Sequence, residues 1–283
     1  MIIIKLEGGL GNQMFQYALG RNLSLIHNTT FKIDYSYLKK ANQSQRTLII
    51  DNYNTVLEEV TDKEVASYTS IFQKILDKIR SKKKMVVEKS NLFDSNILLR
   101  NDGYFVGHWN NEKYFKINEN IIRNDFKLKK PFGEMAQTTA EKINSTPNAT
   151  GIHIRRGDYV TIKKIADKHG VLSISYYEQT MAKIIERFPD TVFFVFSDDM
   201  EWAKENFPKK YPVIFVSNPN IPDYEELILM SLCKHNIIAN STFSWWGAWL
   251  NTNPNKIVIA PKNWFTDINK DTNDLILPAW IQI

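Results

Sequence analysis

Cysteine is nearly absent from this sequence, which has a single one, Cys233, in 283 residues. One thiol excludes an internal disulfide and a cysteine-based metal cluster. Cys233 lies in an apolar stretch with helical spacing, so we interpret it as a core residue and not as a reactive thiol.

Long hydrophobic runs are also absent. No apolar stretch approaches the roughly 18 residues that span a bilayer. The opening segment 1–6 is too short, and too quickly followed by Glu7, for a signal peptide. We therefore expect a cytoplasmic protein.

The sequence lacks common signatures of metal and nucleoside triphosphate chemistry. No two aspartates stand at positions i and i+2, the spacing with which metal-dependent sugar transferases hold a divalent ion. His-Glu-x-x-His and Gly-x-x-x-x-Gly-Lys-Ser/Thr are missing as well. We expect no bound metal, no other cofactor and no kinase-like reaction.

The net charge is +5, and most basic residues are dispersed. The exception is the segment 78–84, in which five of the seven residues are cationic. Such a run is usually a solvated face, and a weak contact with the inner face of a membrane is the second interpretation. Nucleic-acid binding ranks third, because no nucleic-acid-binding motif accompanies the run.

Apolar and helical segments alternate along the second half of the chain, which predicts a parallel sheet with helical crossovers. The expected strands are 150–155, 191–196, 213–216, 236–239 and 256–260. The first half begins in the same way, with a strand at 2–6, but it is less regular. Because the composition changes around 127–149, we predict an α/β protein with domains 1–145 and 146–283.

A glycine-rich turn follows the first expected strand. Gly9-Leu10-Gly11 supplies two glycines of a dinucleotide-binding fingerprint, but Met14 takes the place of the third. Asn12 is a suitable N-cap for the helix that follows, and a helix start favours an anion. A purely structural turn is an equally good interpretation.

The segment 151–159 places charged side chains at the end of a strand. Ile152 and Ile154 alternate with His153 and Arg155, which predicts a buried back and a polar front. Ligands of open α/β sheets bind outside the carboxyl ends of the strands, so this turn is a candidate site. An ordinary surface ion pair between arginine and aspartate is the alternative.

Two further strand ends carry polar groups, one at Asp198 and one at 240–244. Arg155 has the planar fork that grips diphosphate oxygens, and hydroxyls and amides at 240–244 favour the same anion. Asp198, or the pair Glu225 and Glu226, would accept hydrogen bonds from a base or ribose. In the alternative interpretation, the residues at 240–244 merely cap the tryptophan-rich helix that follows.

His108 and Trp109 follow a short expected strand at 103–107. Aromatic faces often stack on sugar rings, and Glu112 lies one helical turn further on. His108, Glu112 and Asp158 are candidate general bases. An ordinary loop or core histidine is the alternative for His108.

Three motifs in order resemble bacterial α-1,2-fucosyltransferases of glycosyltransferase family 11. They are Gly8-Gly9-Leu10-Gly11-Asn12-Gln13-Met14-Phe15-Gln16-Tyr17-Ala18, His153-Ile154-Arg155-Arg156-Gly157-Asp158-Tyr159 and Asn240-Ser241-Thr242-Phe243-Ser244-Trp245-Trp246-Gly247-Ala248-Trp249-Leu250-Asn251. Nothing in 36–100 can be matched. The resemblance implies a GT-B fold, with two Rossmann-like domains facing across a cleft.

The resemblance also implies a reaction in which L-fucose passes from GDP-β-L-fucose to the 2-hydroxyl of a terminal galactose, with inversion and without a metal. Arg155 would contact the β-phosphate, Asp158 would brace the arginine turn and His153 would lie by the nucleotide; we expect these three to be catalytic. The expected donor-binding residues are Gly11, Asn12, His153, Arg155, Asp198, Asn240, Ser241, Thr242, Phe243 and Ser244. The expected acceptor-binding residues are Gln16, His108, Trp109, Glu112 and Tyr159.

Two alternatives stay open at this point. One is a fucosyltransferase of another linkage, such as α-1,6, which shares the arginine motif. The other is a non-catalytic carbohydrate-binding protein, which would bind sugar without any effect of GDP.

Overall fold

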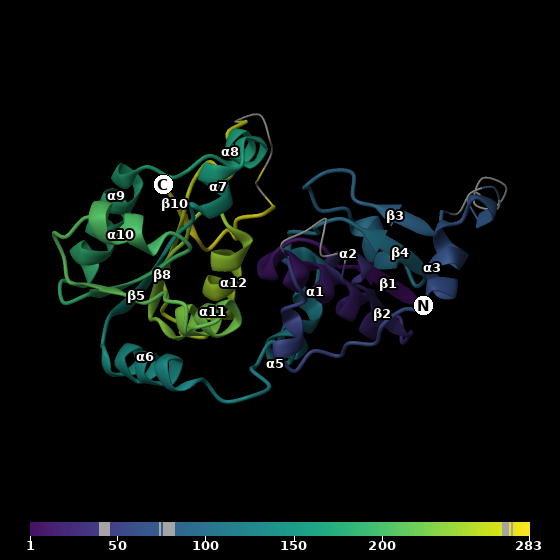
Figure 1. Cartoon of the computed structure of the whole chain (residues 1–283), viewed down its shortest axis with the longest axis horizontal. Coiled ribbons are helices and arrows are strands. Elements are labelled where there is room, and N and C mark those ends of the chain that lie inside the picture. The colour runs from purple at the N-terminus through teal and green to yellow at the C-terminus, as the bar shows by residue number, and fades with distance from the viewer. Residues whose placement is uncertain (40–45, 74, 76–82, 268–271, 273) are drawn as a thin grey trace. The chain divides into compact units, whose positions relative to one another are not determined.

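The computed structural model describes residues 1–39, 46–73, 75, 83–267, 272 and 274–283 (Figure 1). The chain forms two compact units, Met1–Lys129 with Asn273–Leu275 and Lys130–Thr272 with Ile276–Ile283. Each unit carries a parallel sheet with helices, so the predicted α/β class is confirmed. Of the cationic segment 78–84, only Lys83 and Lys84 are among the described residues, and its membrane contact stays a prediction.

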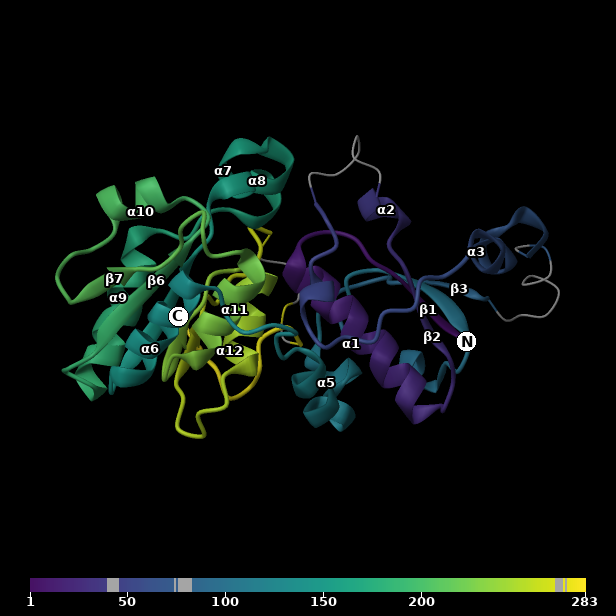
Figure 2. The same ribbon diagram turned by 60° about the horizontal axis from the view of Figure 1, so that its bottom comes forward.

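The first unit contains a four-stranded sheet in the order β2-β1-β4-β3. Its elements are β1 (Ile2–Lys5), α1 (Leu10–Ile26), β2 (Phe31–Asp34), α2 (Ser36–Lys39), α3 (Asp62–Thr69), β3 (Met85–Val87), β4 (Gly103–Val106) and α5 (Glu119–Asp125), with short 3-10 turns at Ile50–Asn52, Ser95–Leu99, Glu112–Tyr114 and Lys116–Asn118. Helix α1 packs on β1 and β2 (Figure 2). Gly20 permits this close packing, since a Cβ there would lie 2.3 Å from Cγ1 of Ile4 and 2.4 Å from Cε2 of Phe31.

Helix α1 begins two residues before Asn12, so the predicted N-cap is wrong. Gly9 is the N-cap, with an extended backbone, and its carbonyl accepts the amides of Asn12 and Gln13 at 3.0 and 3.1 Å. These backbone hydrogen bonds stabilise the first turn of the helix, and no side chain caps it.

The second unit contains a six-stranded sheet in the order β10-β9-β8-β5-β6-β7. Its elements are α6 (Glu134–Ser145), β5 (Ala149–Ile154), α7 (Gly157–Thr161), α8 (Lys163–His169), α9 (Ile174–Arg187), β6 (Val192–Ser197), α10 (Met200–Asn206), β7 (Val213–Phe215), α11 (Asp223–Leu232), β8 (His235–Ile237), α12 (Thr242–Leu250), β9 (Val258–Ala260) and β10 (Ile281–Gln282). Helix α6 packs on α11 and so belongs to this unit, whereas a boundary at 145/146 leaves it in the first.

Strand β5 lies inside this sheet, and all six of its residues are buried. The predicted polar front is therefore wrong for His153, which is only 3% exposed. Strands of a parallel sheet covered on both faces are buried on both sides. The first polar side chain that leaves the sheet belongs to Arg155, the residue that follows the end of β5 at Ile154.

Candidate active site

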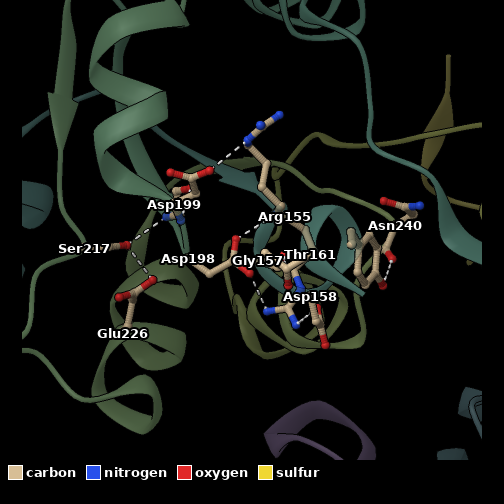
Figure 3. Close-up of polar contacts among 12 residues, drawn as sticks. Arg155, Gly157, Asp158, Thr161, Asp198, Asp199, Ser217, Glu226 and Asn240 are labelled. Atoms are coloured by element: carbon tan, nitrogen blue, oxygen red, sulfur yellow. Dashed lines mark hydrogen bonds and ion pairs between the residues drawn. The ribbon is translucent and has the colours of Figure 1, made fainter. Parts of the chain in front are cut away.

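Polar side chains gather where β5, β6 and β8 end. Ile154 of β5 pairs with Ser197 of β6, so Arg155 and Asp198 leave the sheet side by side. Strand β8 runs parallel on the other side of β5 and leads to Asn240. Figure 3 shows side chains from these strand ends together with the neighbouring Glu226. The sequence-based grouping of the three strand ends at one edge is confirmed.

Arg155 is held between two carboxylates. Its Nη2 donates to Oδ1 of Asp158 at 2.5 Å, and its Nη1 lies 2.9 Å from Oδ2 of Asp198 (Figure 3). The guanidinium also lies over the ring of Tyr159, 5.3 Å from its centroid. Burial alone would lower the pKa of Arg155, but the two carboxylates outweigh it and the pKa is raised. Arg155 therefore stays cationic in a fixed orientation, with further N–H groups of its five beyond these two contacts.

Asp198 is a bracing residue in the structure. Its Oδ1 accepts the backbone amide of Arg156 at 2.8 Å, while its other oxygen faces Arg155. Gly157 makes room for it, because a Cβ there would lie 2.4 Å from Oδ2 of Asp198. The carboxylate is thus engaged by the arginine turn, whereas the sequence had suggested contact with a base or ribose.

Arg156 and Asp199 form a second pair that sequence reasoning missed. Nε of Arg156 donates to Oδ2 of Asp199 at 3.0 Å, and its guanidinium lies 3.8 Å from the ring centroid of Trp202. Asp199 also caps α10 by accepting the amide of Trp202 at 3.2 Å. Two consecutive arginines at one strand end and two consecutive aspartates at the next were the signal available in the sequence.

His153 is buried and neutral. Burial, and then the nearby Arg155, lower the pKa of His153 to about 3. Its ring packs against Phe243 with centroids 5.2 Å apart, and its Nδ1 has no hydrogen-bond partner. Because it does not ionise near neutral pH, His153 offers a neutral imidazole with an unpartnered ring nitrogen and no acid function.

Polar side chains at 240–244 form hydrogen bonds with backbone carbonyls of the second unit. Nδ2 of Asn240 donates to the carbonyls of His169 and Trp264 at 2.8 and 3.3 Å. The hydroxyl of Ser244 donates to the carbonyl of Ser241 at 3.2 Å, and Ser244 is fully buried. Tyr159 is also buried and donates to the carbonyl of Asn240 at 2.9 Å. These three side chains therefore shape the loop and do not project from it as ligands.

The amino end of α12 nevertheless has no side-chain cap. Ser241 is its N-cap residue but makes no capping hydrogen bond, so the alternative of a simple polar cap is wrong for this side chain. Thr242 and Phe243 follow in the first turn and are partly exposed. A helix start of this kind favours an anion near its amides.

Glu226 is a buried carboxyl next to the same edge. Its Oε1 accepts the hydroxyl of Ser217 at 2.7 Å, and that hydroxyl accepts the amide of Ser197 at 2.8 Å (Figure 3). Burial, and then Asp223 and Asp198, raise the pKa of Glu226 to about 8 against the lowering effect of Ser217. Helix α11, which carries Glu226, follows Pro222 and has no side-chain cap.

We expect Glu226→Gln to flatten the pH dependence of stability. A carboxyl whose pKa is raised on folding stabilises the protein below its ordinary pKa of 4.5, and this contribution is lost as the pH rises through about 8. The free energy of unfolding of the wild type should therefore fall more steeply than that of the variant, by about 1.4 kcal/mol per pH unit in this window. Urea unfolding measured across the window checks this, with Glu201→Gln, at an exposed residue of α10, as control. Parallel curves for wild type and Glu226→Gln would contradict it.

In the first unit, two predicted acceptor residues are interior. Gln16 is fully buried, accepts the amide of Glu7 at 3.0 Å and donates to the carbonyl of Gly107 at 3.0 Å, which ties the ends of β1 and β4 together. Trp109 is 1% exposed and packs on Phe105 and Tyr114. Trp109 is therefore not an exposed residue, and its role in acceptor binding stays a prediction.

Glu112 and His108 lie nearer the surface. Glu112 accepts Nζ of Lys116 at 3.0 Å, and His108 is partly buried with an unpartnered Nδ1. Asn12 lies against Gly8, whose positive φ of 82° favours glycine. Sequence reasoning missed Gln13, which holds the glycine turn by donating to the carbonyls of Gly8 and Thr47 at 3.0 and 2.8 Å.

Within the described part of the chain, no group of three or more histidine, cysteine, aspartate or glutamate residues is placed to hold a metal ion. Over the same residues, no helix has both the length and the apolar character needed to cross a membrane.

The comparisons with known proteins agree on a family. The model of glycosyl transferase family 11 matches residues 1–283. The chain is 32% identical over 311 aligned positions to the O-antigen biosynthesis glycosyltransferase WbnK of Escherichia coli, with 98% of this chain and 99% of that protein covered. It is 33% identical over 301 positions to an alpha-1,2-colitosyltransferase of Escherichia coli, with 100% and 99% covered.

More distant similarity extends to eukaryotic proteins. Galactoside alpha-(1,2)-fucosyltransferase 1 of Saimiri boliviensis boliviensis is 29% identical over 174 positions, which cover 57% of this chain and 47% of that protein. A mutant of FUT1 from Arabidopsis thaliana in complex with GDP has a similar fold, with a TM-score of 0.51, 11% identity and coverage of 95% and 72%. The chain belongs to glycosyl transferase family 11, and its fold is GT-B-like.

Proposed function

We propose that this enzyme transfers L-fucose from GDP-β-L-fucose to the 2-hydroxyl of a terminal galactose in an oligosaccharide, with inversion of the anomeric centre and without a metal or other cofactor. The observation that carries the proposal is Arg155, a cation fixed by Asp158 and Asp198 at the strand-end edge of a family 11 chain. The α-1,2 linkage and the galactoside acceptor are taken from the relatives' names.

The proposed mechanism is electrostatic. As the sugar leaves, negative charge develops on the departing diphosphate, and donors already in place lower the barrier. Asp158, Asp198 and Asp199 outnumber Arg155 and Arg156 in the turn, so the turn as a whole is not cationic. Stabilisation must therefore be directional, through the remaining N–H groups of Arg155 and the uncapped start of α12.

The acceptor hydroxyl must lose a proton. Asp158, Glu112 and His108 remain the candidates, and His153 is not one, because it is buried and only 3% exposed. Asp158 is engaged by Arg155 and Glu112 by Lys116, whereas Nδ1 of His108 has no partner. Departure of the sugar as an oxocarbenium-like species needs only a weak base, so no single residue is required to be essential.

A second sugar donor, a colitose analogue of GDP-fucose, is favoured by the name of one relative. The full-length relative that is 33% identical is named an alpha-1,2-colitosyltransferase. Colitose is L-fucose without its 3-hydroxyl, so both donors present the same diphosphate to Arg155 and differ at one sugar position. The proposed chemistry is the same for either sugar.

The test is incubation of the wild type with GDP-fucose or GDP-colitose and lactose, in excess EDTA. We expect GDP release with one of the two donors and a product linked at the 2-hydroxyl of galactose, identified by NMR. Activity that appears only when a divalent metal is added would contradict the metal-independent mechanism. A product linked elsewhere would contradict the α-1,2 linkage, and sugar binding without GDP release would support a carbohydrate-binding protein instead.

A further inference from the structure

The first unit contains a cavity of about 570 Å³ that the proposed reaction leaves unused. It lies along the edge strand β3 and is bordered by residues of the following segment 90–100 and by Trp109 and Tyr114. The volume is within the range of roughly 300–1,000 Å³ typical of small-molecule sites.

Aromatic rings form one wall of the cavity. Trp109 and Tyr114 are 1% and 2% exposed, and their ring centroids are 5.7 Å apart in an edge-to-face arrangement. Phe93 packs on Tyr114 with centroids 5.0 Å apart. Met85 and Ile97 add aliphatic surface. This wall suits a ligand with one apolar face.

Two buried N–H donors in the lining have no acceptor. They are Nε1 of Trp109 and Nε of Arg100. Both oxygens of the neighbouring Glu88 carboxylate already accept backbone amides, those of His108 and Trp109, at 2.7 and 3.0 Å. A buried donor without a partner costs about 1–3 kcal/mol, so such groups point to an absent partner.

The hydroxyl of Tyr114 is a third hydrogen-bond donor in the lining. The hydroxyl of Tyr114 accepts the amide of Asp94 at 3.0 Å, which leaves its own proton to be given to a ligand. Trp109 is moreover held at a positive φ of 57°, an unusual conformation for a tryptophan. The cavity therefore presents donors and aromatic faces together, and its ligand must bring acceptor oxygens and an apolar face.

We propose that this cavity binds a saccharide unit. A pyranose has a face of C–H groups that packs on aromatic rings and a rim of hydroxyl and ring oxygens that accept hydrogen bonds. Resting on the proposed function, the unit is a sugar of the acceptor glycan other than the galactose that is modified. The cavity thereby selects long acceptors over lactose.

Two variants remove the unpartnered donors and keep the bulk of the site. Trp109→Phe deletes the indole N–H and keeps an aromatic ring, and Arg100→Lys deletes Nε and keeps the charge. Trp280→Phe, at a buried tryptophan of the second unit, is the matched control. Circular dichroism and thermal unfolding establish that each variant is folded.

The probe is an array of lactose and longer galactose-terminated oligosaccharides, followed by titration of the best binder. We expect the wild type to prefer longer glycans, and each cavity variant to bind them about 10-fold more weakly, the value of one lost hydrogen bond of about 1.4 kcal/mol. Trp280→Phe should bind like the wild type. Release of GDP from the donor in water alone should be unchanged in all three variants, because that step involves only the donor.

Three results would overturn the proposal. They are unchanged glycan affinity in both cavity variants, no glycan bound by the folded wild type, and binding that is lost in Arg155→Ala but kept in Trp109→Phe. If the wild type releases no GDP from either donor but its glycan binding still depends on Trp109, the proposed reaction fails and the saccharide site stands.

Discussion

Replacing Arg155 by alanine is expected to lower kcat of sugar transfer on the order of 10²-fold or more. The guanidinium is the cation that Asp158 and Asp198 fix at the strand-end edge, with Nη distances of 2.5 and 2.9 Å. Without it, charge on the departing diphosphate faces the carboxylates of Asp158 and Asp198, which have lost their guanidinium partner. The loss should therefore exceed that from deleting a neutral donor.

Arg155→Lys tests whether the positive charge is sufficient or the planar geometry of the guanidinium is also required. Lysine keeps the positive charge but lacks the planar fork, so it cannot contact Asp158, Asp198 and a phosphate in the arginine's geometry. We expect kcat of sugar transfer to fall substantially in Arg155→Lys as well. Initial rates at saturating donor and acceptor measure both variants, with the exposed Arg187→Ala at the end of α9 as control. Near-normal turnover in Arg155→Ala would remove Arg155 from the mechanism.

The strands and their common edge could be predicted because their signals are local. Apolar runs of four to six residues between turn residues define the strands of the second unit, and parallel pairing then places their ends together. Where a signal depends only on neighbouring residues, the sequence was sufficient.

The use of each polar side chain at that edge could not be predicted. Asn240 looks like a ligand in the sequence, but its amide bonds to carbonyls 71 and 24 residues away along the chain. Trp109 follows a strand, and the sequence does not show that Phe105 and Tyr114 pack on it. Such partners come from distant segments, so only the folded structure shows which polar groups are already satisfied and which, like Nδ1 of His153, are not.

Gly157→Ala is expected to reduce kcat/KM on the order of 10²-fold while the protein remains folded. Gly157 is not among the glycines with positive φ, so alanine is compatible with its backbone. The added methyl group would however lie 2.4 Å from Oδ2 and 3.2 Å from Cγ of Asp198. Since that carboxylate bonds to Arg155 and to the amide of Arg156, moving it misplaces the guanidinium.

Gly133→Ala is the matched control, because the nearest atom to its new Cβ is Oε2 of Glu225 at 3.5 Å, an ordinary contact. A double-mutant cycle identifies the route of the effect. If Gly157→Ala acts through Asp198, adding it to Asp198→Ala should cost little further activity, because the group it displaces is already gone. Additive losses in the double variant would show that the methyl group acts elsewhere. Wild-type kinetics in Gly157→Ala would show that Arg155 does not depend on the position of Asp198.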